Sequence, residues 1–225
     1  EASDPIAVPG GPIDPNYYWQ GRIDEVKIYN TALTATQVLA EFGSNYRSIQ
    51  SGNWGSASTW EVFDGTSFVA AIIAPASLDG IITIRTGHNV TVNSAVTADQ
   101  VVIDAGGTLT QTADLSLSNG AGDDLVVNGT YDLQANMLAG PGNVLLQSGS
   151  QMTISTASLK QLQNVAITNP GNINWQDGNI RFDAPNSSVI NNGTFTISGN
   201  NTSFFNGGRL SITNNGTFTK TSTGT

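Results

Sequence analysis

The sequence predicts an all-β chain whose larger part is a right-handed parallel β-helix, and two observations support this prediction. First, a phrase of glycine, a polar residue and an apolar residue recurs toward the C-terminus at steps of 22, 21, 21, 22 and 23 residues. Such a period marks a solenoid, because one repeat cannot bury its own apolar face and stacked neighbours must do so. Second, apolar residues between the phrases alternate with a period of two, as in short strands. The apolar residues of the phrases are Leu109, Tyr131, Met152, Ile173, Phe195 and Phe218.

The corners of the coils are predicted from three Asn-Gly-Thr phrases, which begin at Asn128, Asn192 and Asn215. We expect the glycine of each phrase to adopt a positive φ, as a sharp bend requires. Three short strands per coil then give a triangular cross-section, and stacked coils that rise ~4.8 Å each give a β-helix of roughly 30 Å. The apolar residues of the phrases should stack in one inward column, because each follows the same corner in the same register. Right-handedness follows from the rule for parallel crossovers.

Composition excludes several classes of protein. Only 11% of the 225 residues are charged, against about 25% in an average globular domain. A net charge of −9 with eight scattered basic residues argues against nucleic acid as a partner. The absence of cysteine excludes disulfides and thiolate metal sites. No run of residues approaches the ~20 apolar residues of a membrane span.

The N-terminal part, residues 1–46, has a different pattern. Residues 1–15 are rich in proline and glycine and predict an irregular segment. Residues 19–30 predict a strand with one buried face. A capping box at residues 34–37 opens a short helix that presents Val38, Leu39 and Phe42 on one side and ends near Gly43.

The phrase G-x-I-D-E-V-x-I-Y-N-x-A-L at residues 21–33 resembles the closing segment of laminin-G-like, concanavalin-A-like jelly rolls. The resemblance covers residues 17–42 and implies that residues 1–46 are the tail of such a domain. The calcium and sugar sites of that family lie mostly on loops that this phrase does not include, so no site residue is carried over. Asp24 and Glu25 are expected to hold the last strand and its turn, with metal ligation as the alternative.

Residues 47–80 are predicted to be a linker and a cap of the solenoid. Trp54 and Trp60 should plug the open first coil, rather than present their rings to sugars. The phrases Asn-Trp, Thr-Trp, Gly-His-x-Val-Thr-Val and Gly-Gly-Thr-Leu between residues 51 and 112 resemble the opening of β-helices in large secreted bacterial proteins, particularly Bacteroidetes-type surface proteins. They are also similar to the glycine-rich G8-type module. This resemblance implies a parallel β-helix over residues 81–225 that continues beyond them.

Candidate catalytic groups are few. His88 is the only histidine, and catalysis or zinc binding would need further partners. Paired carboxylates serve glycoside hydrolases, and the turn at Asp123–Asp124 could alternatively hold Ca²⁺. The other carboxylates of the solenoid and its basic residues show no cluster in the sequence. We therefore predict no catalytic, cofactor-binding or metal-ligating residue and no enzyme activity. The residues considered are Asp104, Asp114, Asp123, Asp124, Asp132, Asp177 and Asp183, with Lys160, Arg181 and Arg209.

Aromatic residues and sequons are candidates for contact with sugars. Trp175 lies between Asn174 and Gln176 and is expected to be exposed, and Tyr131, Phe204 and Phe205 could also stack on sugar rings. Corner geometry explains three of the Asn-x-Ser/Thr sequons without a glycan, and stacked asparagine ladders are an equally simple use. The sequons begin at Asn89, Asn128, Asn186, Asn192, Asn200, Asn201 and Asn215.

These observations favour a structural or adhesive segment of a long extracellular, cell-surface or filament-forming bacterial protein. The expected partners are further coils of the same chain, neighbouring copies of it, and surface polysaccharide. The first residue is Glu1 rather than methionine, which suggests a processed chain or part of a longer one. The alternative function is a carbohydrate-binding or carbohydrate-processing β-helix, whose distinguishing feature would be a groove that gathers carboxylates with lysine or arginine.

Overall fold

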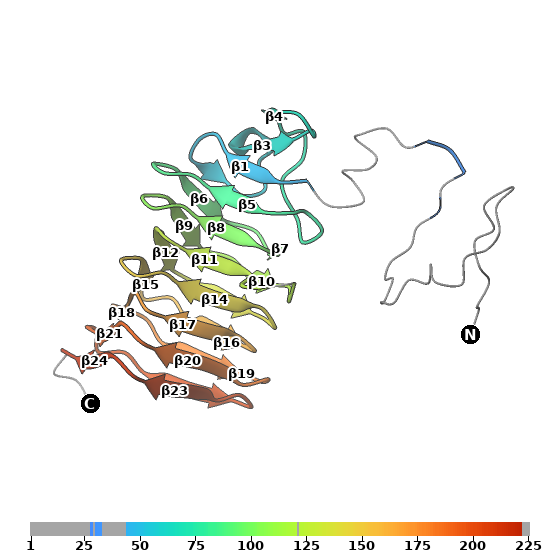
Figure 1. The fold of residues 1–225 in the computed structure, drawn as a ribbon. Helices are drawn as coiled ribbons and strands as arrows, with labels where there is room; N and C mark the ends of the chain where they lie inside the picture. Colours follow the sequence, from blue (N-terminus) through green and yellow to red (C-terminus); the bar gives the residue numbers. More distant parts are fainter. Residues whose placement is uncertain (1–27, 29, 33–43, 121, 222–225) are drawn as a thin grey trace, which may run out of the picture. The chain divides into compact units, whose positions relative to one another are not determined.

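A computed structural model describes residues 28, 30–32, 44–120 and 122–221 of the chain. The chain divides into two compact units, residues 1–33 and 34–225, and the second contains a parallel β-helix (Figure 1). The predicted strand over residues 19–30 and the predicted helix over residues 34–43 fall almost entirely outside the described residues, as do Asp24 and Glu25. The only helix among the described residues is a single 3₁₀ turn, Ala57–Thr59. The solenoid prediction is confirmed by the strands of successive coils, which pair in parallel in three sheets.

Three sheets, named sheet A, sheet B and sheet C here, form the sides of the β-helix. From residue 82 onward, each complete coil contributes one strand to each sheet in that order, and the strands of neighbouring coils pair in parallel. Sheet A contains β1 (Tyr46–Ser48), β3 (Trp60–Phe63), β4 (Phe68–Ala70), β5 (Ile82–Ile84), β8 (Val101–Ile103), β11 (Leu125–Val127), β14 (Asn143–Leu146), β17 (Ala166–Asn169), β20 (Ser187–Asn191) and β23 (Leu210–Asn214). Sheet B contains β2 (Gly52–Asn53), β6 (Asn89–Val92), β9 (Thr108–Gln111), β12 (Thr130–Leu133), β15 (Gln151–Ile154), β18 (Asn172–Trp175), β21 (Thr194–Ile197) and β24 (Thr217–Lys220). Sheet C contains β7 (Val96–Ala98), β10 (Leu115–Leu117), β13 (Asn136–Ala139), β16 (Lys160–Gln163), β19 (Ile180–Asp183) and β22 (Ser203–Asn206).

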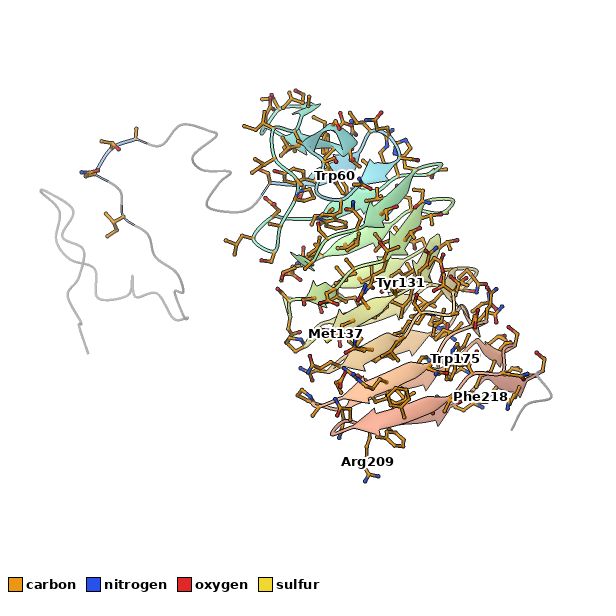
Figure 2. The ribbon with its side chains drawn as sticks, turned by 180° about the vertical axis from the view of Figure 1, so that it is seen from behind. Trp60, Tyr131, Met137, Trp175, Arg209 and Phe218 are labelled. Atoms are coloured by element: carbon orange, nitrogen blue, oxygen red, sulfur yellow. The ribbon has the colours of Figure 1, made fainter. Side chains whose placement is uncertain are left out.

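The predicted inward column is confirmed in sheet B. Leu109 pairs with Tyr131, Tyr131 with Met152, and each later member with the next as far as Phe218. All members are buried except Phe218, which is 43% exposed on the last described strand of the column. Figure 2 shows Tyr131 near the middle of the stack and Phe218 at its C-terminal end. The register follows from the burial of one face, because a shift of one residue would turn every apolar side chain outward.

The corner glycines have a different physical role from the predicted one. A positive φ is absent at Gly129, Gly193 and Gly216. A Cβ on Gly129 would lie 2.3 Å from the carbonyl oxygen of Gly107, and a Cβ on Gly193 would lie 2.1 Å from that of Gly171. These glycines therefore allow the backbones of adjacent coils to approach closely.

The same corner explains the one irregular spacing in the repeat. In the coil that contains Met152, Ser150 occupies the position of the crowded glycine, and Gly149 before it has a φ of +86°. The Ser150 amide donates to Gln147 O (3.0 Å), while Gln151 N donates to Gly129 O (3.0 Å). Met152 therefore follows the glycine one residue later than its counterparts, yet it keeps the register of the column.

The N-terminal end of the β-helix is closed by Trp54 and Trp60, as predicted. Both rings are at most 1% exposed, and they meet edge-on with their centroids 5.1 Å apart. Trp54 Nε1 donates to Pro75 O (3.0 Å) and Trp60 Nε1 donates to Trp54 O (2.7 Å). Each polar edge is satisfied by a backbone carbonyl, so both rings can cover the first coil without an unpaired N–H.

Candidate functional site

His88 and the paired aspartates lie apart from one another. His88 Nδ1 lies 2.8 Å from the hydroxyl of Ser48, which also accepts a bond from Arg85 N (3.0 Å). Asp123 is exposed, whereas Asp124 is fully buried and accepts a bond from Gly120 N (2.9 Å). In the part of the chain that the structure describes, no three His, Asp or Glu residues gather closely enough to hold a metal ion.

Two basic residues of the solenoid, which show no cluster in the sequence, make specific polar contacts in the structure. Arg181 pairs with Asp183 at 3.1 Å and donates to Gln161. Lys160, the first residue of β16, is fully buried, and its Nζ donates to Thr156 O and to Asp177 O (3.2 Å). Burial lowers the pKa of Lys160, and nearby carboxylates oppose this effect only in part. Both side chains therefore hold their own coil and the neighbouring coil together through hydrogen bonds and an ion pair.

Two of the expected sugar-stacking rings lie inside the β-helix. Trp175 is 7% exposed and donates from Nε1 to Gly178 O (2.7 Å). It lies two residues after Ile173, so it shares the inward face of β18, and its polar neighbours in sequence belong to the outward face. Tyr131 is buried, and its hydroxyl donates to the Gln111 side chain. Phe204 and Phe205 do have exposed surface, 39% and 64%.

An asparagine ladder runs through the corner between sheets A and B, and its residues lie outside the sequons. Asn169 Nδ2 donates to Asn191 Oδ1 (2.7 Å), and Asn191 Nδ2 donates to Asn214 Oδ1 (2.6 Å). Outside this buried ladder, Asn215 Nδ2 donates to Asn192 Oδ1 (2.9 Å). The sequon asparagines of two corners are thus stacked on each other.

The outer face of sheet B is polar and nearly uncharged. Each strand from β6 to β24 places its first and third residues outward, because the residues between and after them face the core. Threonine is the commonest residue, and Asp132 is the single charged one. β-branched threonine has a stiff χ1, so its hydroxyl and methyl groups are held in place. The outward residues are Asn89, Thr91, Thr108, Thr110, Thr130, Asp132, Gln151, Thr153, Asn172, Asn174, Thr194, Thr196, Thr217 and Thr219.

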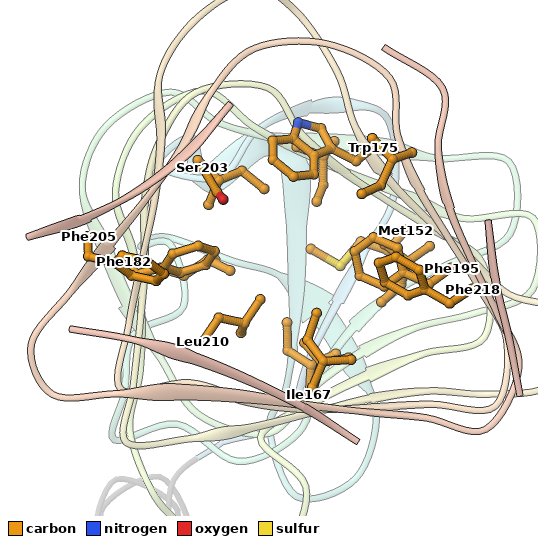
Figure 3. Close-up of a pocket in the computed structure, with 16 residues that line it drawn as sticks. Met152, Ile167, Trp175, Phe182, Phe195, Ser203, Phe205, Leu210 and Phe218 are labelled. Carbon is orange, nitrogen blue, oxygen red and sulfur yellow. The ribbon is translucent and has the colours of Figure 1, made fainter. Parts of the chain in front are cut away.

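The C-terminal end of the described β-helix holds an apolar cavity of about 270 Å³ (Figure 3). Met152 and Trp175 line it from within, and the last coils contribute Phe205 and Phe218. The Phe195 and Phe218 rings stack with their centroids 5.0 Å apart. The cavity is the interior of the β-helix at its last described coils. No charged side chain lines it.

A second cavity, of about 350 Å³, lies on the outer face of sheet A near its N-terminal end. We call it the arginine pocket and define it by its lining residues. Alternation along β1 and β5 points Arg47 and Thr83 outward, and Arg85 follows two residues after Thr83. The lining residues are Asn45, Tyr46, Arg47, Phe68, Ile81, Thr83, Arg85 and Asp104.

One glutamate, Glu61, contacts both guanidinium groups of the arginine pocket. Arg47 Nε donates to Glu61 Oε1, and Arg85 Nη1 lies 3.7 Å from the same oxygen. The Arg47 guanidinium also lies 3.8 Å above the centre of the Phe68 ring, a cation–π geometry that fixes its plane. The pocket thus gathers two arginines with Asp104, and both arginines also contact Glu61 beside it. The sequence alone did not show this cluster.

Comparisons of the chain with protein-family models, with curated proteins and with solved structures found no match. The fold and the surfaces described above are therefore the basis for inference about function. Among the described residues, no helix is long and apolar enough to cross a membrane.

Proposed function

We propose that this chain is a non-catalytic structural and adhesive segment of a long extracellular or cell-surface bacterial protein. The observation that carries the proposal is the continuous, in-register stack of parallel coils, in which each coil contacts its neighbours along three sheets. Such a stack resists bending and local opening because every inner strand is paired on both sides. It would serve as a stiff spacer that holds other parts of a protein at a distance.

Three features support an extracellular location for this spacer. The charged fraction is low and cysteine is absent, so folding does not depend on the redox state of the compartment. The phrases between residues 51 and 112 resemble the β-helices of Bacteroidetes-type surface proteins, and residues 17–42 resemble a laminin-G-like segment. The polar outer face of sheet B offers rows of hydroxyl and amide groups for lateral contact with surface polysaccharide or with neighbouring copies of the chain.

Antibody labelling of intact cells of the source organism tests this proposal. An antibody raised against the 225-residue chain should label the surface of unpermeabilised cells. Broad-specificity protease applied to the purified chain should leave a resistant fragment that contains residues 44–221, since its strands expose few unpaired backbone segments. Labelling only after permeabilisation, or rapid digestion throughout the coils, would contradict the proposal.

A second candidate function is carbohydrate binding by the β-helix. The observation that favours it is the arginine pocket, which brings Arg47, Arg85 and Asp104 together in a concave site. Catalytic processing of a carbohydrate is less well supported, because hydrolysis requires a defined pair of carboxyl groups on either side of the bond to be cleaved. A screen of the purified chain against polysaccharides, with release of reducing ends as the readout, separates binding from processing.

A further inference from the structure

We infer that the arginine pocket binds the acidic sugar residue, a uronate, of a carboxylated polysaccharide. This goes beyond the spacer function, which requires no specific ligand. The pocket volume of about 350 Å³ is at the lower end of the range of small-molecule sites, so it suits one or two sugar rings rather than a long segment of chain.

The guanidinium groups provide the acid-binding part of the pocket. Arg47 and Arg85 share a single Glu61 oxygen, so two positive charges face one negative charge on that side. The 3.7 Å separation between Arg85 Nη1 and Glu61 Oε1 is too long for a good hydrogen bond. A ligand carboxylate can therefore accept bonds from Arg85, and the planar fork of arginine favours a bidentate contact.

Arg47 is prepared for the same ligand by its neighbours. Its stacking on Phe68 and its bond from Nε to Glu61 fix the orientation of the guanidinium plane. Because Nε is used in this bond, the terminal nitrogens remain as the donors that a ligand could meet. A pre-oriented side chain loses less conformational entropy when it binds.

The remaining wall of the pocket selects for hydroxyl groups. Asp104 can only accept hydrogen bonds when ionised, so it repels a bare anion but accepts bonds from sugar hydroxyls. The Asn45 Oδ1 atom already accepts a bond from Ile81 N (2.8 Å), which turns its amide nitrogen into the available donor, and Thr83 adds a hydroxyl. A ligand that carries both a carboxylate and adjacent hydroxyls satisfies both sides, whereas sulfate or phosphate satisfies only the arginines.

Titration of the full chain with a galacturonic acid trimer tests the inference, followed by calorimetry or by NMR. We expect saturable binding in the millimolar range, and at least about tenfold weaker binding of the trimer methyl ester, because the ester lacks the charge that a bidentate arginine recognises. Arg85→Gln should weaken trimer binding by about tenfold or more. Arg209→Gln, which changes an exposed arginine outside the pocket, should leave the affinity unchanged.

Asp104→Asn provides a second, independent test. It should weaken trimer binding and should strengthen the binding of inorganic sulfate, since the repelling charge is removed. Equal affinity of the original chain and Arg85→Gln for the trimer, absence of trimer binding by the folded chain, or sulfate binding as tight as that of the trimer would each overturn the inference. None of these outcomes bears on surface labelling of cells, so the spacer function is tested separately.

Discussion

Asn191 is the centre of the buried asparagine ladder, and its replacement by alanine should weaken the last described coils. The side chain is fully buried. It accepts a bond from Asn169 Nδ2 (2.7 Å) and donates to Asn214 Oδ1 (2.6 Å) and Thr217 O (2.9 Å). Alanine removes all three bonds and leaves a buried donor of Asn169 with only its bond to Thr194 O (3.1 Å).

The expected cost is about 2–3 kcal/mol, because an unpaired buried polar group costs about 1–3 kcal/mol and the exposed Asn214 can turn to water. Coils near the end of a solenoid can open without the rest of the stack. Hydrogen exchange followed by mass spectrometry is therefore a better readout than a single unfolding transition. Exchange of the amides in β21, β23 and β24 should accelerate by roughly 30- to 150-fold, since 1.4 kcal/mol corresponds to a factor of ten.

Asn192→Ala is the matched control, because Asn192 is adjacent and exposed and has one side-chain hydrogen bond, with Asn215, outside the buried ladder. It should change exchange by no more than about threefold, as expected for a surface substitution. Asn191→Leu distinguishes hydrogen bonding from packing, since leucine fills the site but leaves the Asn169 amide against an apolar neighbour. Native protection in Asn191→Leu, or equal effects of the two alanine changes, would refute the reasoning.

Two further predictions concern the corner glycines and the partly buried carboxylate of Asp99. Gly193→Ala should cost more than about 3 kcal/mol, because its Cβ would lie 2.1 Å from Gly171 O. Gly87→Ala should cost only about 1–2 kcal/mol, because it meets a φ of +80° but no atom within 4 Å. Similar urea midpoints for the two variants would contradict this account of crowding. Burial, followed by the hydrogen bond and charge of Asp124, raises the pKa of Asp99 above 3.8. The folded chain therefore binds the Asp99 proton more tightly than the unfolded chain. The stabilisation from this protonated carboxyl is complete below pH 3.8 and is lost as the pH rises through the raised pKa of the folded state. Asp99→Asn should thus stabilise the chain near neutral pH and lose that advantage below pH 3.8, and a gain that is the same at both pH values would contradict the prediction.

The repeat could be predicted from the sequence because register and burial leave a periodic trace. Leu109, Tyr131 and Phe195 stand in one column since each follows a corner at the same distance. The role of the corner glycines could not be predicted in this way. A positive φ and a close approach between coils both select glycine, and only the distance between coils distinguishes them. Ser150 at the same corner shows that the crowding can be relieved when a neighbouring glycine takes the positive φ.

Trp175 was wrongly predicted to be exposed because of its polar sequence neighbours. The strand period of two would have predicted its burial. Its polar neighbours suggested exposure, although a count of two residues from Ile173 places it on the inward face. The arginine pocket had no such signal. Arg47, Glu61 and Arg85 come from three strands or their ends, and the antiparallel pairing of β1 with β3 brings the first two together. This pairing belongs to the non-repeating cap, whose register no periodicity reveals.

The repeat and the cap differ in how well each could select a particular ligand. A repeating coil presents the same kind of polar surface at every level, so its contacts can be many but have little means of selecting one ligand. The cap breaks the repeat: β3 and β4 pair antiparallel, and the hairpin they form carries Phe68 over the outer face of sheet A. Only there does the described chain join two guanidinium groups, an aromatic ring and a free carboxylate in one concavity. Selective recognition is therefore expected at the cap, whereas the proposed spacer function would belong to the coils below it.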